Sequence, residues 1–259
     1  MLLAIDVGNT EVTIGLFEGR KLKRSFRMSS ETRRTPDELT LLFTQAFPEL
    51  GVRGERQAAM ASVVPALTPS YSETSRRLCG RAPLLVSSDI PTGVEVEYRD
   101  PRSAGADRIA NAAAAIERYG APVIVVDFGT ATTFDVILKG GRYVGGVIAP
   151  GILTGAEHLI RRAARLSAFE LKAPERVVGR NTEESLQAGV FYGAVGQVDS
   201  IVKRIAAEER IRPTVVATGG LAPAIAAHSK TIQKVDLDLT LHGLRIIHEL
   251  NSKPKRGKK

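Results

Sequence analysis

Apolar and polar positions alternate along residues 2–28 in a way that predicts three consecutive strands. Residues 2–8 (LLAIDVG) indicate a short buried strand, residues 10–17 (TEVTIGLF) a second strand, and residues 21–28 (KLKRSFRM) a third. Phe17-Glu18-Gly19-Arg20 supplies the turn between the last two. The first strand is unusual because it ends in a carboxylate, Asp6, followed by glycine and small polar residues.

The same layout occurs a second time, near the middle of the chain. Residues 123–129 (VIVVDFG), 132–138 (TTFDVIL) and 142–148 (RYVGGVI) predict three more strands, with Lys139-Gly140-Gly141 as a turn. One constant offset places Asp6 on Asp127, Gly8 on Gly129, Gly19 on Gly140 and Lys21 on Arg142. Two matching Asp-x-Gly strands, each followed by a hairpin, indicate an internal repeat.

Helical periodicity fills the chain between and after these strands. It predicts helices over residues 36–50, 68–80, 105–120, 181–210, 221–228 and 239–250. Further strands are expected at residues 56–65, 83–88 and 214–220. We therefore expect two similar α/β domains, each opening with an antiparallel meander, over residues 1–116 and 117–252. Residues 253–259 form a basic tail that we expect to be disordered.

Composition narrows the classes of function. Five of the eight excess positive charges lie in residues 253–259, and no aromatic residues interleave the basic clusters, so we do not expect nucleic-acid binding. No apolar run is long enough for a membrane span, and the N-terminal residues lack the basic leader of a signal peptide. A single cysteine, Cys79, excludes an internal disulfide, and we expect a cytoplasmic protein.

Three loops carry groups suited to a nucleotide. In DVGNT, Asp6 offers a carboxylate to Mg²⁺, Gly8 allows close backbone approach, and Asn9 and Thr10 offer donors to phosphate oxygens. DFGTATT (127–133) repeats this arrangement with three threonines, and Gly219-Gly220 lies at a strand-to-helix turn against which a base or ribose can lie. A single such loop is equally typical of a simple Asx turn, but the three in order predict a phosphate-binding cleft.

The ordered set DVGNT, DFGTATT and ATGG resembles the phosphate and adenosine motifs of the acetate/sugar kinase, Hsp70 and actin superfamily. Within it, the chain resembles type III pantothenate kinases, a family that also includes the Bvg accessory factors. The motifs are IDVGNT (5–10), ASVVP (61–65), YRDPRSAGADR (98–108), VDFGTATTFD (126–135), GGVIAPG (145–151), NTEES (181–185) and TGG (218–220). The resemblance implies two ribonuclease H-like (actin-like ATPase) domains, each a mixed sheet flanked by helices.

The resemblance also assigns roles to individual residues. It makes Asp107, which lies in the first turn of a predicted helix, the general base that takes a proton from the pantothenate hydroxyl. It places Tyr98, Gly105, Arg108 and Thr182 at the pantothenate pocket. Asp6 would organise Mg²⁺ and phosphate, and Asp127 would hold a monovalent cation. The residues expected around ATP are Asp6, Gly8, Asn9, Thr10, Gly129, Thr130, Gly219 and Gly220.

The resemblance therefore implies ATP-dependent phosphorylation of pantothenate, the first step of coenzyme A synthesis. It implies a divalent cation such as Mg²⁺, activation by K⁺ or NH₄⁺, and a homodimer with the substrate pocket at the subunit interface. Two alternatives remain open from the residues: a non-catalytic transcriptional accessory factor of the same family, and a related kinase acting on another hydroxyl substrate such as a sugar. The absence of a G-x-x-x-x-G-K-[ST] motif excludes a P-loop kinase.

Overall fold

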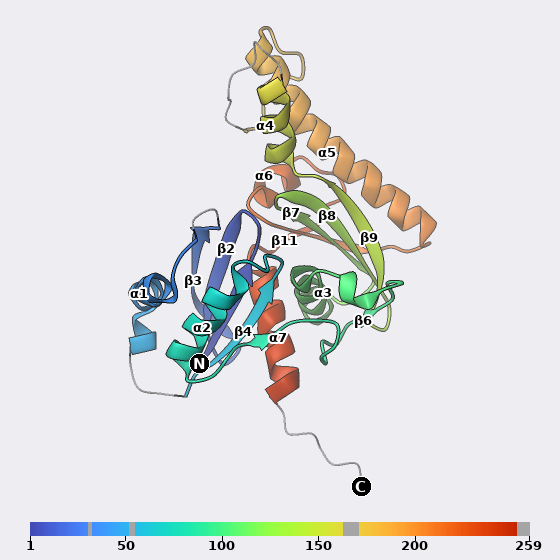
Figure 1. The fold of residues 1–259 in the computed structure, drawn as a ribbon. Helices are drawn as coiled ribbons and strands as arrows, with labels where there is room; N and C mark the ends of the chain where they lie inside the picture. Colours follow the sequence, from blue (N-terminus) through green and yellow to red (C-terminus); the bar gives the residue numbers. More distant parts are fainter. Residues whose placement is uncertain (31–32, 52–54, 163–170, 253–259) are drawn as a thin grey trace. The chain divides into compact units, whose positions relative to one another are not determined.

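The computed structural model describes residues 1–30, 33–51, 55–162 and 171–252 (Figure 1). Contacts between Cα atoms divide the chain into two compact units. The first unit contains residues 1–114 together with the C-terminal segment from Asp238, and the second contains residues 115–237. The chain passes from one unit to the other within helix α3 (Ala106–Tyr119) and again just before helix α7 (Leu239–Ser252).

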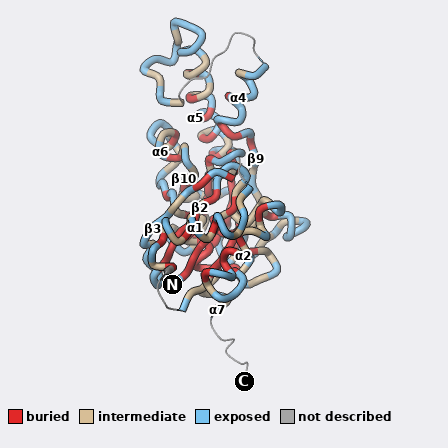
Figure 2. The backbone as a smooth tube through the Cα atoms, turned by 60° about the vertical axis from the view of Figure 1, so that its left-hand side comes forward, coloured by how far each residue is buried: buried red, intermediate tan, exposed pale blue. Residues whose placement is uncertain are grey.

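The first unit is built on a five-stranded mixed sheet in the order β3-β2-β1-β4-β5. Strand β1 (Leu2–Val7) pairs antiparallel with β2 (Glu11–Glu18) and parallel with β4 (Gln57–Ser62). Strand β3 (Lys21–Ser29) extends the meander, and β5 (Leu84–Leu85) is short. The predicted meander is therefore confirmed. Strand β1, at the centre of the sheet, is buried along nearly its whole length, and Figure 2 shows buried backbone in red beside β2.

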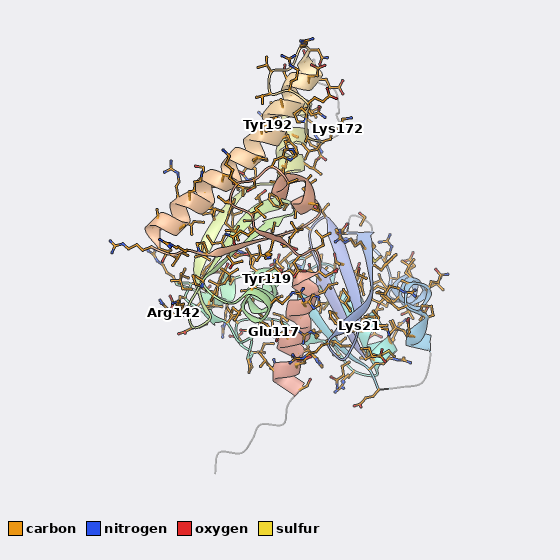
Figure 3. The ribbon with its side chains drawn as sticks, turned by 180° about the vertical axis from the view of Figure 1, so that it is seen from behind. Lys21, Glu117, Tyr119, Arg142, Lys172 and Tyr192 are labelled. Atoms are coloured by element: carbon orange, nitrogen blue, oxygen red, sulfur yellow. The ribbon has the colours of Figure 1, made fainter. Side chains whose placement is uncertain are left out.

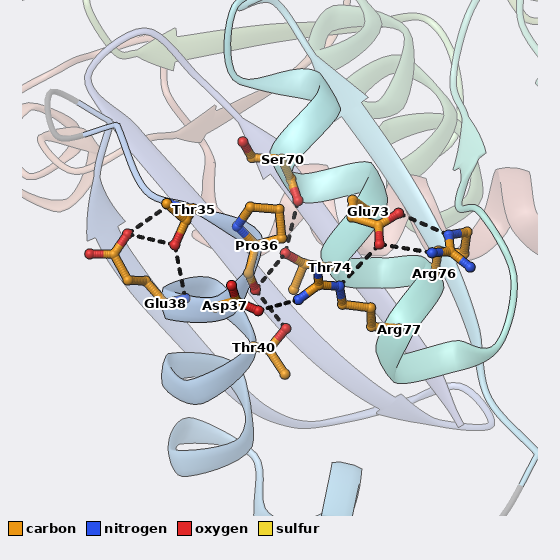
Figure 4. A network of polar contacts seen from close by, with 10 residues as sticks. All are labelled: Thr35, Pro36, Asp37, Glu38, Thr40, Ser70, Glu73, Thr74, Arg76 and Arg77. Atoms are coloured by element: carbon orange, nitrogen blue, oxygen red, sulfur yellow. Dashed lines mark hydrogen bonds and ion pairs between the residues drawn. The ribbon is translucent and has the colours of Figure 1, made fainter.

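Helices α1 (Pro36–Ala46) and α2 (Thr68–Cys79) cover one face of this sheet. Alternate strand residues such as Leu3 and Ile5 pack there against Phe43 of α1. Helix α1 begins with a capping box between Thr35 and Glu38. Figure 4 shows how the two helices are joined at their surface. The Arg77 side chain forms ion pairs with Asp37 of α1 and Glu73 of α2, and the Thr74 hydroxyl approaches the Pro36 carbonyl.

Helix α7 packs on the opposite face, which is lined by small residues. Ala4 and Gly15 lie opposite each other in the β1–β2 ladder, and Gly15 faces Leu241 of α7. A Cβ atom on Gly15 would lie 2.8 Å from a Leu241 methyl carbon, so a larger residue there would require the Leu241 side chain to shift. Gly243 of α7 similarly lies against the Ala110 backbone in α3, where a Cβ would overlap the Ala110 carbonyl.

The second unit has its own mixed sheet, whose strands run in the order β11-β10-β7-β8-β9. They are β7 (Val123–Phe128), β8 (Ala131–Leu138), β9 (Arg142–Pro150), β10 (Thr214–Thr218) and β11 (Lys234–Val235). Helices α5 (Thr182–Glu208) and α6 (Ala222–Ala226) pack on one face through Phe191, Val198 and Ile225. Helix α4 (Ile152–Arg162) and the N-terminal part of α5 extend beyond this sheet (Figure 1).

The two meanders share their strand registers and differ by one residue in each of their two loops. Each contains a register shift at the same place in its second ladder, between Leu16 and Phe17 and between Val136 and Ile137. Asp6 lies opposite Thr13, whereas Asp127 lies opposite Thr133, so the second loop is one residue shorter. The constant offset between the two repeats, assumed from the sequence, is therefore wrong for the residues of β2 and β8. An extra residue in the β8–β9 turn restores it at Lys21 and Arg142, both labelled in Figure 3.

Other differences from the sequence prediction concern boundaries and short elements. The structure adds helix α4, the two-residue strand β6 (Glu95–Val96) and the 3₁₀ turns η1 (Pro48–Gly51) and η2 (Pro101–Ser103), which the sequence did not predict. Helix α7 packs on β1, β2 and β4 of the first unit, whereas the predicted second domain (117–252) includes it. The predicted boundary after residue 116 stays a prediction. The basic tail, 253–259, lies outside the described residues.

Candidate active site

Asp6 and the loop after it form the first candidate phosphate site. Asp6 is the sixth residue of the chain, is half-buried at the end of β1, and lies between Thr13 of β2 and Ala61 of β4. The Gly8 N–H donates to the Glu11 carbonyl at 3.1 Å, which closes the loop. A Cβ on Gly8 would lie 2.8 Å from that carbonyl oxygen, so the loop requires glycine. Asn9 and Thr10, at the tip, are exposed to solvent.

A residue that the sequence did not single out holds this loop. Ser30 directly follows β3 and is buried. Its hydroxyl donates to the Gly8 carbonyl at 2.7 Å, and its N–H donates to the Thr10 carbonyl at 2.9 Å. The only sequence signal was the position of Ser30 at the end of the third strand of the meander.

The second unit repeats this arrangement around Asp127. Asp127 is half-buried at the end of β7, opposite Thr133 of β8 and Thr218 of β10. The Gly129 N–H donates to the Ala131 carbonyl at 3.0 Å, and Gly129 and Thr130 are exposed. The structure therefore confirms that both loops stand at the ends of equivalent strands.

The two glycines of the TGG motif differ in what the structure requires of them. Gly219 has φ +88°, and a Cβ there would lie 2.5 Å from the Phe128 carbonyl oxygen and 2.8 Å from Asp127 Oδ1. Gly220 has no positive φ, and a Cβ on it would meet no atom within 4 Å. Gly219 thus lies against the Asp127 carboxylate, whereas Gly220 borders open space.

The start of helix α4 contacts the loop that follows Asp127. Gly151 precedes the helix, and a Cβ on it would overlap the Thr130 carbonyl oxygen and lie 2.7 Å from that of Gly129. The Thr154 hydroxyl, in the first turn of α4, donates to the Thr130 carbonyl at 3.0 Å. Gly151 lies within the motif GGVIAPG, and the sequence predicts no role for it or for Thr154.

The start of α3 brings together four of the predicted residues. Arg108 stacks near Tyr98, with the guanidinium carbon 5.9 Å from the ring centroid. Gly105 allows the Asp107 carboxylate to lie directly against it, because a Cβ there would overlap Asp107 Oδ1. The Arg108 backbone N–H donates to Asp107 Oδ1 at 2.8 Å. A carboxylate, a guanidinium and an aromatic ring are therefore grouped within one short segment of the first unit.

Burial and hydrogen bonding act in opposite directions on Asp107. Burial raises the pKa of its carboxyl group above the ordinary value, and this effect outweighs the backbone hydrogen bond from Arg108 and the attraction of the Arg108 charge, which both lower it. The sequence placed Asp107 in a first helical turn, which the structure confirms. The raised pKa is typical of a carboxylate that exchanges protons during a reaction.

Thr182, the remaining residue predicted for the pantothenate pocket, belongs to the second unit. It is the exposed first residue of α5, next to the N-cap Asn181, whose side chain accepts a hydrogen bond from the Glu184 N–H. The segment before α5 is fixed to the helix, since the Tyr192 hydroxyl donates to the Pro174 carbonyl at 3.2 Å. Tyr192 and Lys172, in the same region, are labelled in Figure 3.

The Asp6 carboxylate suits a metal ion that is bound partly by the protein and partly by substrate phosphates. Over the residues that the structure describes, no three His, Cys, Asp or Glu side chains gather into a protein-only metal site. Mg²⁺ is usually held by one or two carboxylates together with substrate phosphates. Asp6, beside a loop of backbone and hydroxyl groups, fits that pattern of ligands.

Comparisons with known proteins bear on the family of this chain. The type III pantothenate kinase family model matches residues 2–204. A type III pantothenate kinase from Geobacter sulfurreducens is 47% identical, with 97% of this chain and 99% of the relative covered. One from Anaeromyxobacter sp. (strain K) is 49% identical, with 97% and 100% covered. The chain belongs to the type III pantothenate kinase family.

Solved structures support the fold of this family member. A Baf family protein from Campylobacter jejuni, a candidate transcriptional activator, aligns with a TM-score of 0.61 at 19% identity, covering 96% of this chain and 98% of its own. A candidate 2-dehydro-3-deoxygalactonokinase from Sinorhizobium meliloti aligns with a TM-score of 0.59 at 9% identity, covering 100% and 99%. These likenesses show the fold alone, which is the actin-like ATPase fold predicted from the sequence. Within the described residues, no helix is long and apolar enough to cross a membrane.

Proposed function

We propose a role for individual residues of this chain in the reaction of its family. As a type III pantothenate kinase, the chain transfers the γ-phosphoryl group of ATP to the pantothenate hydroxyl with a divalent cation present. The observation that carries our proposal is the grouping of Asp107, Arg108 and Tyr98 at the start of α3. It unites a proton acceptor with a group that binds a carboxylate, and pantothenate has both a hydroxyl and a carboxylate.

Asp107 acts as the general base. It accepts the proton of the pantothenate hydroxyl as that oxygen attacks the γ-phosphorus. Its raised pKa makes the carboxylate a stronger base than a solvated aspartate. The N–H of Arg108 fixes the orientation of the carboxylate.

Arg108 and Tyr98 bind the remainder of pantothenate. The guanidinium donates to the substrate carboxylate, and the Tyr98 ring beside it restricts the orientation of the guanidinium. Gly105 allows the Asp107 carboxylate to keep this position, because a side chain at residue 105 would displace it. Thr182 contributes to the same pocket.

The loops after β1 and β7 bind the phosphates of ATP. Asp6 holds the divalent cation, which neutralises phosphate charge, and Gly8, Asn9, Thr10, Gly129 and Thr130 donate to phosphate oxygens. Support comes from the exposure of both loop tips and from the tight turns that close them. In phosphoryl transfer such positioning and charge neutralisation account for most of the catalysis.

Asp127 holds a monovalent cation, K⁺ or NH₄⁺. The Asp127 carboxylate oxygen and the Phe128 carbonyl oxygen both lie close to Gly219, so two oxygen ligands of the kind that such cations prefer converge there. The open space beside Gly220 accommodates the adenosine moiety.

The active protein is a cytoplasmic homodimer whose substrate pocket includes the subunit interface. Support comes from large apolar side chains that are exposed on the second unit, among them Ile148, Leu153, Leu159, Val177 and Val178. Val178, before α5, is 75% exposed. Apolar side chains that are exposed in a monomer become buried when they lie in an association surface. Light scattering on the purified protein should give twice the chain mass, and a monomer that turns over at the full rate would contradict the dimer.

The test of the assigned reaction is ADP release coupled to NADH oxidation, with Mg²⁺, ATP and pantothenate, in Na⁺ or K⁺ buffers. We expect pantothenate-dependent ADP release that increases with K⁺. In Asp127→Asn the K⁺ stimulation should disappear, while Lys21→Ala serves as a surface control. Equal rates in Na⁺ and K⁺ would remove Asp127 from this role, and absence of pantothenate-dependent ADP would refute the function.

A further inference from the structure

In each unit, the residue that follows the third strand of the meander contacts the carbonyl groups of the candidate phosphate loop. In the first unit this residue is Ser30, which directly follows β3. It contacts two loop carbonyls at once, through its hydroxyl to Gly8 at 2.7 Å and through its N–H to Thr10 at 2.9 Å. Ser30 is only 7% exposed, so these hydrogen bonds are shielded from competing water.

These hydrogen bonds determine the direction of the loop's amide groups. In a trans peptide the C=O and the N–H point in opposite directions. Because the Gly8 carbonyl is directed toward Ser30, the N–H of the same peptide, which belongs to Asn9, is directed away from Ser30. Asn9 is exposed, so this N–H lies on the solvent side of the loop. A ligand oxygen on that side meets an N–H that is already oriented.

The second unit holds its loop with different chemistry at the equivalent position. Gly151 directly follows β9, as Ser30 follows β3. Its missing Cβ allows it to lie against the carbonyls of Gly129 and Thr130. The hydroxyl that Ser30 supplies in the first unit is replaced by that of Thr154, which donates to the Thr130 carbonyl at 3.0 Å. In both units a hydroxyl thus donates to a carbonyl of the loop, although the residue that supplies it differs.

We propose that Ser30 and Thr154 are positioning residues that orient the two phosphate loops for the β- and γ-phosphates of ATP. This inference rests on the proposed role of the loops in binding phosphate. Neither side chain touches the ligand, and each acts by fixing the peptide groups that do. Loss of either hydroxyl should therefore weaken recognition of phosphate and leave recognition of the nucleoside unchanged.

The first test uses calorimetric binding of MgATP and of adenosine to Ser30→Ala, Ser30→Thr and wild type. Ser30→Ala should weaken MgATP binding about three- to tenfold, as loss of one hydrogen bond predicts, and change adenosine binding less than twofold. Ser30→Thr keeps the hydroxyl and should restore most of the affinity. Ser25→Ala, an exposed serine on β3, is the matched control. Equal weakening of both ligands, or of neither, would overturn the proposal.

Thr154 offers a second test on an exposed helix position, where folding is not at risk. Thr154→Val removes the donor with little change of shape, and it should weaken MgATP binding similarly, while Thr154→Ser should not. The variant Asp6→Asn distinguishes failure of the phosphate-binding role of the loop from failure of the positioning role of Ser30 and Thr154. If Asp6→Asn binds MgATP as wild type does, the phosphate assignment of the loop fails. If Asp6→Asn weakens MgATP binding but Ser30→Ala and Thr154→Val do not, only the positioning role fails.

Discussion

Replacing the two glycines of the TGG motif one at a time should give opposite results. Gly219→Ala introduces a Cβ 2.5 Å from the Phe128 carbonyl oxygen and 2.8 Å from Asp127 Oδ1, on a backbone with φ +88°. The left-handed conformation costs about 1–2 kcal/mol for alanine, and overpacking adds about 1–3 kcal/mol. Gly220→Ala meets no atom within 4 Å and should leave the free energy of unfolding nearly unchanged.

Thermal unfolding and nucleotide binding measured on both variants provide the assay. One kcal/mol corresponds to about 2–4 °C for a chain of this size, so Gly219→Ala should lower the midpoint by at least about 5 °C. Gly220→Ala should keep the wild-type midpoint but weaken ATP binding, because its methyl group enters the space assigned to adenosine. A Gly219→Ala protein with the wild-type midpoint, or a Gly220→Ala protein with wild-type ATP affinity, would refute the reasoning.

Two further predictions concern titrating groups. Because burial raises the pKa of Asp107 in the folded state, ionisation of this carboxyl group destabilises the fold as pH rises from its unfolded to its folded pKa, and the loss stays constant above both. Asp107→Asn should therefore have a higher unfolding midpoint than wild type at pH 8 and lose this advantage near pH 4, close to the ordinary pKa of aspartate. Hydrogen bonds from Arg76 and then Arg77 lower the pKa of Glu73 to about 2, so its stabilising contribution should be full above about pH 4.5 and disappear as pH falls toward 2. Solvent screens the charge of Glu73, so the difference in thermal unfolding midpoint between wild type and Glu73→Gln should be small at pH 7. This difference should shrink in 0.5 M salt. A difference that persists in salt would contradict the prediction.

The strands and their terminal acids were predictable because their signals are local. Apolar runs ending in Asp6 and Asp127 specify strands, and the glycine after each specifies a tight turn. The long helix α5 and the start of α3 were equally clear, since capping residues and helical periodicity lie within the segment itself. These features needed no knowledge of the tertiary fold.

The features that the sequence did not predict depend on tertiary contacts. The hydroxyl of Ser30 is important because β3 returns beside the β1–β2 loop, and nothing in its neighbours predicts that contact. Helix α7 lies far along the chain from β1, and its place beside Gly15 follows from packing of small residues rather than from sequence order. The different requirements at Gly219 and Gly220 likewise arise from the position of the Asp127 strand, which a Gly-Gly pair does not reveal.

The central claim is that Asp107 is the base, while Asp6 organises the metal and phosphates. The most direct test measures pantothenate-dependent ADP release and MgATP affinity on Asp107→Asn, which preserves side-chain shape. Turnover should fall by about 10²–10⁴-fold or more, with the dissociation constant for MgATP within about twofold of wild type. Turnover close to that of wild type would contradict the claim and remove Asp107 from the base role.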